Sequence, residues 1–414
     1  MRKEVLMLRG LLKCSLGEPQ INKDFSGEFL SYDEWKKLSD IVIKHKIAGI
    51  VYEKLSQIDS VPENILGKIK SEAIKTANAD FRLLFLSRDI LGLLDEYRIP
   101  AVLLKGMGTA ALYQSPLCRK SGDIDILIPD DSRLADAVSL LEANGFVLAE
   151  KQLALHHAVM TYEDIIDVEL HSMLAEPFDN DRINKIIGKQ QRRLLELNGS
   201  RVCLSSDESD IITKDVLGVD LRVLGDAFHA YELLLHMLQH YLRSGFGLRL
   251  LCDWVVFWNR NLPDEVYKDY LNLVRESHIK GFSDMITLVC YKHLGLRRRA
   301  ARRLRPGESK LTRSEVDSYF MDFIKAAEFG KVSKDRMVAL RGNGILDYVR
   351  EFHHQMKLRF PRGSRNVLLW PVLWLLTLTC FLINNRKIRN VSLRSILKTA
   401  GKRGKMTEKL RLFV

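Results

Sequence analysis

Three acidic side chains, carried by two segments with strand-like sequence, are the residues best suited to chemistry. Asp123 and Asp125 begin the segment 123–128, where apolar residues alternate with the acids. Side chains two apart on a strand share a face, so we expect both carboxylates to point the same way. Glu169, in the second segment at 165–171, would supply a third. Such grouped carboxylates favour Mg²⁺ or Mn²⁺ over zinc and suit two-metal phosphoryl transfer.

A glycine-containing turn precedes these acids and could bind phosphate. The residues Lys105-Gly106-Met107-Gly108 follow an apolar run at 101–104 and precede a predicted helix at 110–113. Amide groups at the start of a helix bind phosphate oxygens, and glycine lets the backbone come close to them. We therefore expect Gly106 and Gly108 to seat a triphosphate, with positive charge from Lys105 and Arg119.

Each of these motifs also has a structural interpretation. An Asp-x-Asp pair at the start of a strand is often only a solvated cap, and by itself it favours structure over catalysis. The order of the elements favours catalysis instead: glycine turn, helix, basic residue, Asp-x-Asp strand, then a later strand with glutamate. This is the order that a nucleotidyl-transfer site requires.

Several further polar residues are candidates for the same site. His171 shares a strand face with Glu169, so it either orients that carboxylate, contacts phosphate, or is a structural histidine. His236 and His240 lie four apart on a predicted helix, but the metalloprotease motif is excluded because no glutamate follows His236. The side of that helix that carries His236 and His240 either faces solvent or lines the cleft opposite the acids. Asp253, in an apolar helix, either recognises base or ribose or pairs with a basic residue.

The helices and strands expected to position these residues indicate an α+β fold. Residues 1–98 have helical spacing of apolar residues, 99–205 alternate strand and helix signals, and 206–330 return to helical spacing. The range 99–205 is long enough for one small mixed sheet with a few helices. The strands that we expect there are 101–104, 124–128, 146–148, 158–162, 165–171 and 201–204. Residues 331–414 form a basic tail.

Composition excludes several classes of protein. The chain has 414 residues, of which 46% are hydrophobic and 28% charged, so it is not globally disordered. Its six cysteines form no CxxC pair, which argues against a disulfide scaffold or a zinc knuckle. The basic residues Arg9 and Lys13 interrupt the apolar residues at the N-terminus, so no signal peptide is expected and we predict a cytoplasmic protein.

The excess of positive over negative charge lies in the tail. The net charge of the chain is +12, but nineteen basic and four acidic residues give 331–414 a charge of +15 and leave −3 for the rest. Within this tail, 367–383 is an uncharged apolar stretch that contains Pro371 and, at about 1.5 Å per residue, barely spans a bilayer. We predict a helix in the interface, with Trp370 and Trp374 at headgroup depth and the basic residues on anionic lipids.

Other partners for the tail stay open. The apolar helix at 367–383 could pack on the body of the protein instead, or cross the membrane. Nucleic acid is a less favoured partner, because the tail lacks aromatic residues interleaved among its basic ones. The expected location is therefore the cytoplasm, peripheral at the inner face of the membrane.

The chain resembles the DNA polymerase β-like nucleotidyltransferase superfamily, and more specifically an uncharacterised bacterial nucleotidyltransferase family. The resemblance covers about residues 31–260. Met107 departs from the pattern, because the superfamily has a serine at this point of its glycine turn. The matching segments are Leu104-Lys105-Gly106, Arg119, Asp123-Ile124-Asp125-Ile126-Leu127-Ile128, Val168-Glu169-Leu170-His171, Leu234-Leu235-His236, His240 and Asp253.

The resemblance implies a metal-dependent enzyme that moves a nucleoside monophosphate from an NTP to an acceptor and releases pyrophosphate. Asp123 and Asp125 would coordinate two Mg²⁺ or Mn²⁺ ions, and Glu169 would hold the ion at the attacking oxygen. The nucleotide would contact Lys105, Gly106, Gly108, Arg119, His171, His236, His240 and Asp253.

The acceptor is left open between a small molecule, a sugar and a protein. A second hypothesis is a non-catalytic, membrane-associated adaptor that binds nucleotide on the same fold, for example in surface polysaccharide biosynthesis. A third is a toxin-neutralising enzyme that adenylylates a partner protein.

Overall fold

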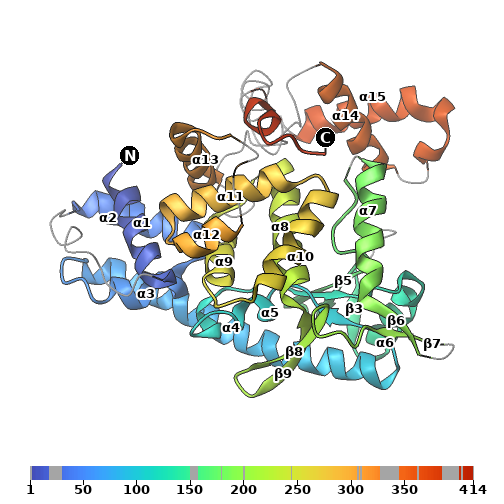
Figure 1. Cartoon of the computed structure of the whole chain (residues 1–414), viewed down its shortest axis with the longest axis horizontal. Coiled ribbons are helices and arrows are strands. Elements are labelled where there is room, and N and C mark those ends of the chain that lie inside the picture. Colours follow the sequence, from blue (N-terminus) through green and yellow to red (C-terminus); the bar gives the residue numbers. More distant parts are fainter. Residues whose placement is uncertain are drawn as a thin grey trace.

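The computed structural model describes most of the chain. The described residues are 2–17, 30–149, 157–178, 180–198, 201–243, 245–304, 307, 310–326, 345–360, 363–384, 401 and 404–413. Helices predominate, and the strands gather at one end of the molecule (Figure 1). This arrangement confirms the predicted α+β class with a mixed sheet.

Within the described residues, seven strands form one mixed sheet in the order β3-β4-β5-β2-β1-β9-β8, and two more form a separate hairpin. The central pairs β2·β5 and β1·β9 are parallel, while β1·β2 and the outer pairs are antiparallel. The strands are β1 (Val102–Leu103), β2 (Ile124–Leu127), β3 (Phe146–Leu148), β4 (His157–Tyr162), β5 (Ile166–His171), β6 (Leu195–Asn198), β7 (Arg201–Leu204), β8 (Ile211–Val216) and β9 (Val219–Leu224).

Alternation along β2 explains how the sheet separates its two faces. Ile124, Ile126 and Ile128 belong to one hydrophobic cluster, which includes the second half of α4 (Glu63–Glu96) and α6 (Leu134–Ala143). Leu127 belongs to the other cluster, which is formed mainly by helices. Because side chains two apart share a face, Asp125 points to the same side as Leu127.

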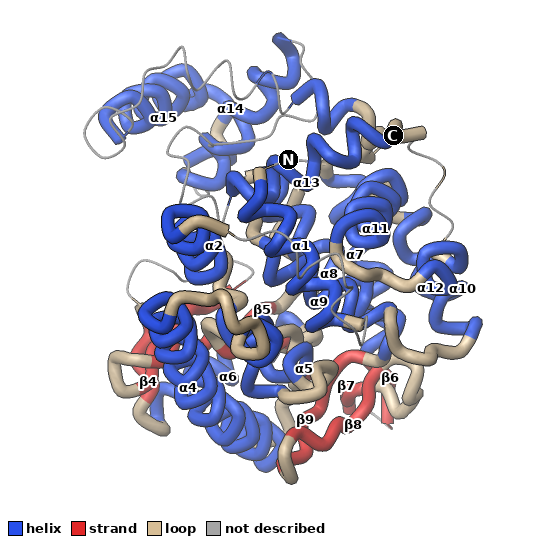
Figure 2. Tube along the Cα trace, turned by 90° about the vertical axis from the view of Figure 1, so that its left-hand side faces the viewer, coloured by secondary structure: helices blue, strands red, loops and turns tan. Residues whose placement is uncertain are grey.

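The helices that cover this second face come from both ends of the chain. The first three helices share one hydrophobic core with the helices that follow the sheet. Figure 2 shows α4 running past the sheet, away from the C-terminal helices. The remaining helices of the body are α1 (Lys3–Leu16), α2 (Tyr32–Lys44), α3 (Ala48–Leu55), α5 (Met107–Ala110), α7 (Asp181–Gln191), α8 (Asp226–Leu242), α9 (Leu248–Trp258), α10 (Asp264–Glu276), α11 (Lys280–His293), α12 (Arg298–Arg303) and α13 (Arg313–Ala326).

The range 206–330, expected to be helical, begins instead with two strands. β8 and β9 form a hairpin around Leu217 and Gly218, and β9 joins the sheet beside β1. Both turn residues have positive φ, at 56° and 81°, as two-residue hairpin turns require. The sheet therefore continues to Leu224, beyond the predicted limit of 205.

The described part of the tail contains two packed helices, α14 (Ile345–Arg359) and α15 (Trp370–Asn384). The helix predicted at 367–383 thus begins as a short 3-10 turn at Val367–Leu369 and becomes α-helical at Trp370. Pro371 lies in the first turn of α15, where the missing amide hydrogen costs no helical hydrogen bond. Among the described helices, none combines the length and apolar character that crossing a membrane requires.

Candidate active site

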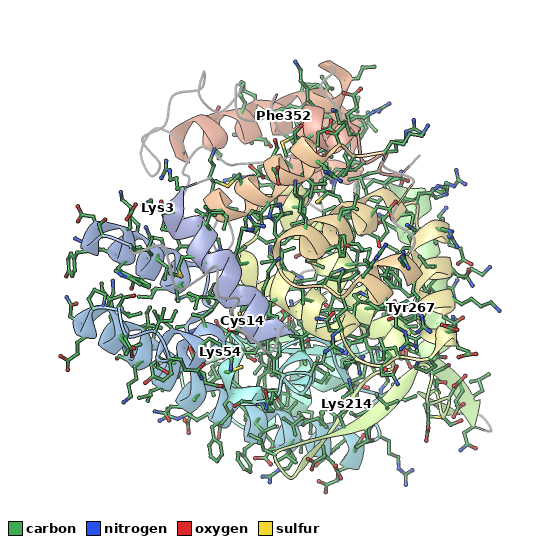
Figure 3. All side chains as sticks on the ribbon, turned by 60° about the vertical axis from the view of Figure 1, so that its left-hand side comes forward. Lys3, Cys14, Lys54, Lys214, Tyr267 and Phe352 are labelled. Carbon is green, nitrogen blue, oxygen red and sulfur yellow. The ribbon has the colours of Figure 1, made fainter. Side chains whose placement is uncertain are left out.

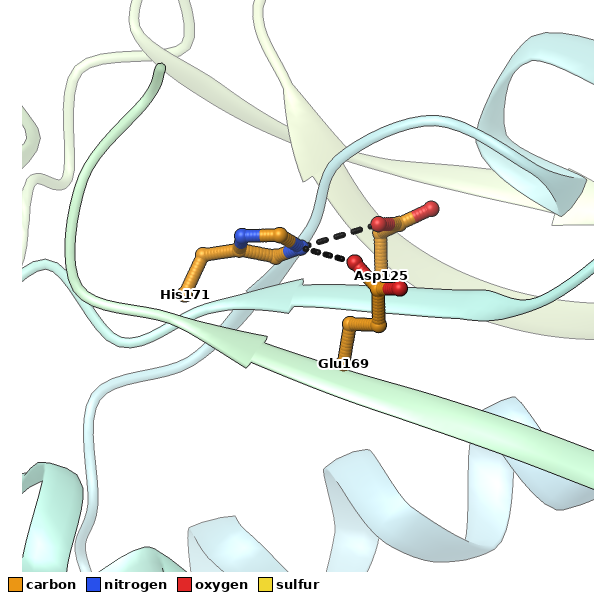
Figure 4. Close-up of side chains that lie close together, drawn as sticks. All are labelled: Asp125, Glu169 and His171. Carbon is orange, nitrogen blue, oxygen red and sulfur yellow. Dashed lines mark hydrogen bonds and ion pairs between the residues drawn. The ribbon is translucent and has the colours of Figure 1, made fainter. Parts of the chain in front are cut away.

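The two parallel strands β2 and β5 bring Asp125 and Glu169 together. The two residues are register partners, so their side chains lie next to each other on one face of the sheet. His171 follows Glu169 by two and shares its face. Potential ligand atoms of the three side chains all lie within 4.8 Å of one another (Figure 4). The sequence prediction that carboxylates from two strands converge is thus met by Asp125 and Glu169.

His171 binds both carboxylates of this group. Its Nε2 lies 2.9 Å from Asp125 Oδ1 and 3.4 Å from Glu169 Oε2. Burial alone would lower the pKa of His171, but the hydrogen bonds to the two carboxylates outweigh it and raise the pKa to about 9. The structure therefore places His171 in contact with both acids, as a residue that orients them would be.

Lys105 is the second cation on Asp125. Its Nζ lies 3.0 Å from Asp125 Oδ1 and 3.2 Å from His236 Nδ1. Burial would lower the pKa of Lys105, but the surrounding carboxylates, Asp125 foremost, together outweigh burial and hold this pKa above its ordinary value. Burial would likewise raise the pKa of Asp125, yet Lys105 and His171 hold it well below the ordinary range. The fully buried Asp125 is therefore a carboxylate between two cations.

Asp123 was predicted as the third member of this group of side chains. In the structure the third member of the close cluster is His171 instead. The carboxyl of Asp123 is half-buried. Repulsion from Asp125, followed by burial, raises the pKa of Asp123 to about 6. The two aspartates thus feel each other's charge, as their shared strand face predicts.

The donor set fits a hard divalent cation. Asp125 Oδ2 is buried, and no hydrogen-bond partner for it is found among the described residues. A buried carboxylate oxygen without a partner is costly unless a cation or water satisfies it. Oxygen ligands from Asp125 and Glu169 are compatible with Mg²⁺ or Mn²⁺, which prefer carboxylates.

The glycine turn lies against the start of β2. Gly106 has φ 63° and ψ −120°, a conformation that residues with a side chain rarely adopt, and a Cβ on it would lie 3.3 Å from the Asp123 carbonyl oxygen. Gly108 packs against β9 instead, since a Cβ there would come within 3.0 Å of Val223. Gly106 therefore adjoins the acids, whereas Gly108 is needed for packing.

The turn differs from the expected phosphate cradle in two ways. The amides of Gly108, Thr109 and Ala110 donate to the carbonyls of Lys105 or Gly106, so they are used within the turn. Met107, in the place of the superfamily's serine, is buried in the core. The hydroxyl of the nearby Thr109 is buried as well, 3.1 Å from His229 Nε2.

Arg119 and Asp253 form a buried ion pair beneath this turn. The Arg119 side chain is 2% exposed; its Nη2 donates to Asp253 Oδ2 at 2.8 Å and its Nε to Oδ1 at 3.1 Å. A third nitrogen, Nη1, lies 3.4 Å from the Gly106 carbonyl oxygen, and Tyr113 donates to Asp253 at 2.7 Å. Arg119 is thus turned to Asp253 rather than to an open triphosphate site. Of the two interpretations of Asp253, the structure shows the ion pair.

Helix α8 covers the acids with a polar row at helical spacing. His236 contacts Lys105, and its ring centroid lies 4.4 Å from that of His240. Burial lowers the pKa of His236 well below its ordinary value and that of His240 to about 3, so both rings are neutral. The polar side of α8 thus faces Lys105 and the acids.

Two buried acids near the site were not among the predicted site residues. Glu232, one turn before His236, is buried on α8, and burial raises its pKa to about 7. Asp80 of α4 accepts a hydrogen bond from the Ser121 amide at 2.9 Å, just before Asp123. The spacing of Glu232 and His236 could have revealed the first, while the pairing of Asp80 with a distant loop left no signal.

A separate cleft lies away from these acids. It has a volume of about 770 Å³ and is lined by residues of α1, α3 and α9, with Cys14 and Lys54 at its wall (Figure 3). Tyr113 also lines it, and through Asp253 this side chain connects the cleft to Arg119. The acids themselves do not line it.

Comparison with known families now identifies the class of the chain. Residues 31–295 match the family described as uncharacterised nucleotidyltransferase. The chain belongs to this nucleotidyltransferase family. Membership implies a transferase with a nucleoside triphosphate as substrate, and nucleotidyltransferases generally use divalent metals. The matched range includes the sheet, the acids and helix α8.

Two further comparisons add less about this nucleotidyltransferase. A solved structure, an antigenic nucleotidyltransferase-like protein from Paracoccidioides brasiliensis, is similar with 16% identity and a TM-score of 0.29. The similarity covers 48% of this chain and 87% of that one, and at this TM-score it carries no argument about the site. No curated protein matches the chain.

Proposed function

We propose that the protein is a metal-dependent nucleotidyltransferase that moves a nucleoside monophosphate from an NTP to an acceptor and releases pyrophosphate. One observation carries the proposal: Asp125 and Glu169 lie side by side on two parallel strands, in a chain of the nucleotidyltransferase family. Rigid strands hold such carboxylates in place without an ordering cost when the substrate binds.

The residues around the cation have distinct proposed roles. Asp125 and Glu169 would hold the cation, with Asp123 beside them adding negative charge. When bound, such an ion lowers the pKa of the attacking hydroxyl and neutralises charge on the leaving pyrophosphate. Glu169, the more exposed of the two carboxylates, is placed to accept the acceptor's proton. His171 orients both carboxylates.

Lys105 and the residues around it are proposed to receive the triphosphate. Lys105 contacts Asp125 at 3.0 Å, and its Nζ could turn from this carboxylate toward a phosphate oxygen. Gly106 supplies the backbone bend at the start of β2, and Arg119 with Asp253 holds this bend from below. His236 and His240, both neutral, would line the nucleotide's path along α8.

Nucleotide binding and label transfer test the proposal. We expect titration calorimetry to show that wild type binds MgATP, MgCTP, MgGTP or MgUTP, and that Asp125→Asn weakens binding at least about tenfold. Asp220→Asn, an exposed change of the same kind on β9, should bind as wild type does. Equal binding by wild type and Asp125→Asn, or by neither, would contradict the metal site.

Incubation of the protein with labelled NTPs, Mg²⁺ and cell lysate then tests the transfer itself. Label on a sugar, another small molecule or a protein, identified by mass spectrometry, would define the acceptor. Tight binding without transfer would instead support the non-catalytic adaptor, which the burial of Met107 in the glycine turn favours. We further propose that the protein acts in the cytoplasm at the inner face of the membrane, supported by the basic tail.

A further inference from the structure

One side of α15 presents an exposed surface without charge that is mainly apolar; its polar residue is Thr379, whose hydroxyl donates to the Leu375 carbonyl oxygen. Val372 and Leu375 of α15 are 57% and 64% exposed, and Leu376 and Leu378 are exposed beside them; Leu368, in the 3-10 turn just before the helix, is 87% exposed. At about 100° per residue, the four positions within α15 fall within one half of the helix circumference. We call this set the apolar outer face. A charge-free surface of this kind marks a site of interaction in a folded protein.

The opposite side of α15 is already occupied by α14. Leu373 and Thr377 are buried. The indole Nε1 of Trp374 donates to His353 Nδ1 at 3.2 Å, and the Trp370 ring lies 4.5 Å from the same histidine. The two tryptophans therefore pack on α14. The side of α15 that remains available to a membrane is the leucine-rich side, rather than the side with the tryptophans as predicted.

Positive charge flanks the apolar outer face. Lys357, Arg359 and Arg365 are exposed just before it, and Figure 1 shows α14 and α15 projecting beyond the body of the molecule. The sequence from 385 to 405, directly after α15, has eight basic residues and no acidic one. An apolar helix face that basic residues precede and follow in the sequence complements an anionic lipid surface, which offers hydrocarbon and negative headgroups.

We propose that the apolar outer face of α15 is a docking surface for an anionic lipid bilayer, on which the helix lies parallel to the membrane plane. The fifteen residues of α15 extend about 22 Å, less than the roughly 30 Å of a hydrocarbon core. Side chains on one face of such a helix reach about 5–10 Å into the boundary between headgroups and acyl chains.

This proposal gives the predicted membrane association a specific surface and is independent of the catalytic one. Vesicle binding is measured without nucleotide, so loss of transferase activity leaves it untouched. Conversely, label transfer in solution without vesicle binding would support the proposed transferase activity and contradict this docking surface.

The test is co-sedimentation of the full chain with vesicles. Wild type should bind vesicles of phosphatidylcholine and phosphatidylglycerol in equal parts at least about tenfold more tightly than vesicles of phosphatidylcholine alone. Leu368→Glu with Leu375→Glu should weaken binding to the anionic vesicles by at least about tenfold. Both positions are exposed, so the fold should persist, as circular dichroism can verify.

The matched control is Leu197→Glu with Leu217→Glu. Both leucines are exposed on the body, and the pair changes charge and hydrophobicity by the same amount. We expect binding within about twofold of wild type. Raising the salt concentration from about 0.1 M to about 1 M, which shortens the screening length from about 10 Å to about 3 Å, should weaken binding as well.

Two results would overturn the proposal. The first is vesicle binding by the α15 variant equal to that of wild type, or no vesicle binding by wild type. The second is self-association of wild type without vesicle binding, where the self-association is lost in the α15 variant. The occupant of the surface would then be a second copy of the chain.

Discussion

Asp125 and Glu169, 44 positions apart in the chain, are direct register partners on the parallel strands β2 and β5. The hydrogen bonds of the sheet therefore set the separation of the two carboxylates. His171 then ties the two carboxylates together from one side, and Lys105 holds Asp125 from the other.

Replacing Glu169 by Gln should abolish most of the proposed transfer. The amide keeps the shape of the side chain but loses the charge for a cation and the oxygen that accepts a proton. We expect pyrophosphate release to fall by about a hundredfold or more, with little change in melting temperature because Glu169 is partly exposed. Chelation of divalent ions should have the same effect, reversed by added Mg²⁺ or Mn²⁺. A variant that retains the wild-type rate would exclude Glu169 from the reaction.

Breaking the Arg119–Asp253 pair should strongly destabilise the fold. Asp253→Asn leaves the buried guanidinium without its counter-charge, so we expect a loss of about 3–5 kcal/mol in the free energy of unfolding, measured with denaturant. The exposed pair Arg133–Asp136 is the control, and Asp136→Asn should cost no more than about 1 kcal/mol. Similar small losses in both variants would mean that water or other groups screen the buried pair.

Adding a methyl group at Gly106 should destabilise the turn. The positive φ there is strained for any residue with a side chain, and the new Cβ would crowd the Asp123 carbonyl. We expect Gly106→Ala to cost about 1–3 kcal/mol and to weaken NTP binding. Gly67→Ala, in the second turn of α4 with open space around it, should instead stabilise the protein by about 0.5–1 kcal/mol. Equal effects at the two glycines would contradict the role of the turn.

The buried His45 should make stability depend on pH. The Leu248 amide donates to His45 Nδ1 at 3.0 Å, so Nε2 carries the hydrogen and donates to the Ile324 carbonyl at 3.1 Å. Burial lowers the pKa of this neutral ring to about 4. Between pH 6.5 and about 4 the unfolded chain takes up a proton that the folded chain refuses, so stability falls as pH falls.

The full effect of His45 corresponds to about 3 kcal/mol of unfolding free energy between these limits. Above pH 6.5 the ring is neutral in both states and contributes no pH dependence. Denaturation of wild type and His45→Gln across this range should therefore give curves whose difference shrinks as the pH is lowered. Parallel curves would show that the proton is taken up equally in both states.

Local patterns predicted most of the central sheet. The strands at 124–128 and 165–171 alternate or end in clear turn residues, and the structure has β2 and β5 there. The hairpin of β8 and β9, which α8 follows directly, was missed. Two signals were available: the buried Val219, Leu221 and Val223 alternate with charged residues as in a half-buried strand, and the Leu217-Gly218 turn precedes them.

The acids of the site could be predicted because their spacing along each strand sets which way they face. The pairing of Arg119 with Asp253 could not, because these residues are 134 positions apart and on different elements. The same holds for Asp80 and Ser121, whose contact depends on how α4 packs against a loop. Apolar periodicity predicts where the helices lie in the sequence, but it does not predict which helices pack against each other.

The hydrophobic core shared by the two ends of the chain has a consequence for synthesis. Trp35 and Val51 near the N-terminus pack in the same cluster as Trp254, Phe282 and Phe323. At about 5–20 residues per second, a ribosome needs on the order of ten to fifty seconds to make the intervening chain. During that time the first helices present uncovered apolar surface, so the nascent protein should be a client of chaperones until α13 emerges.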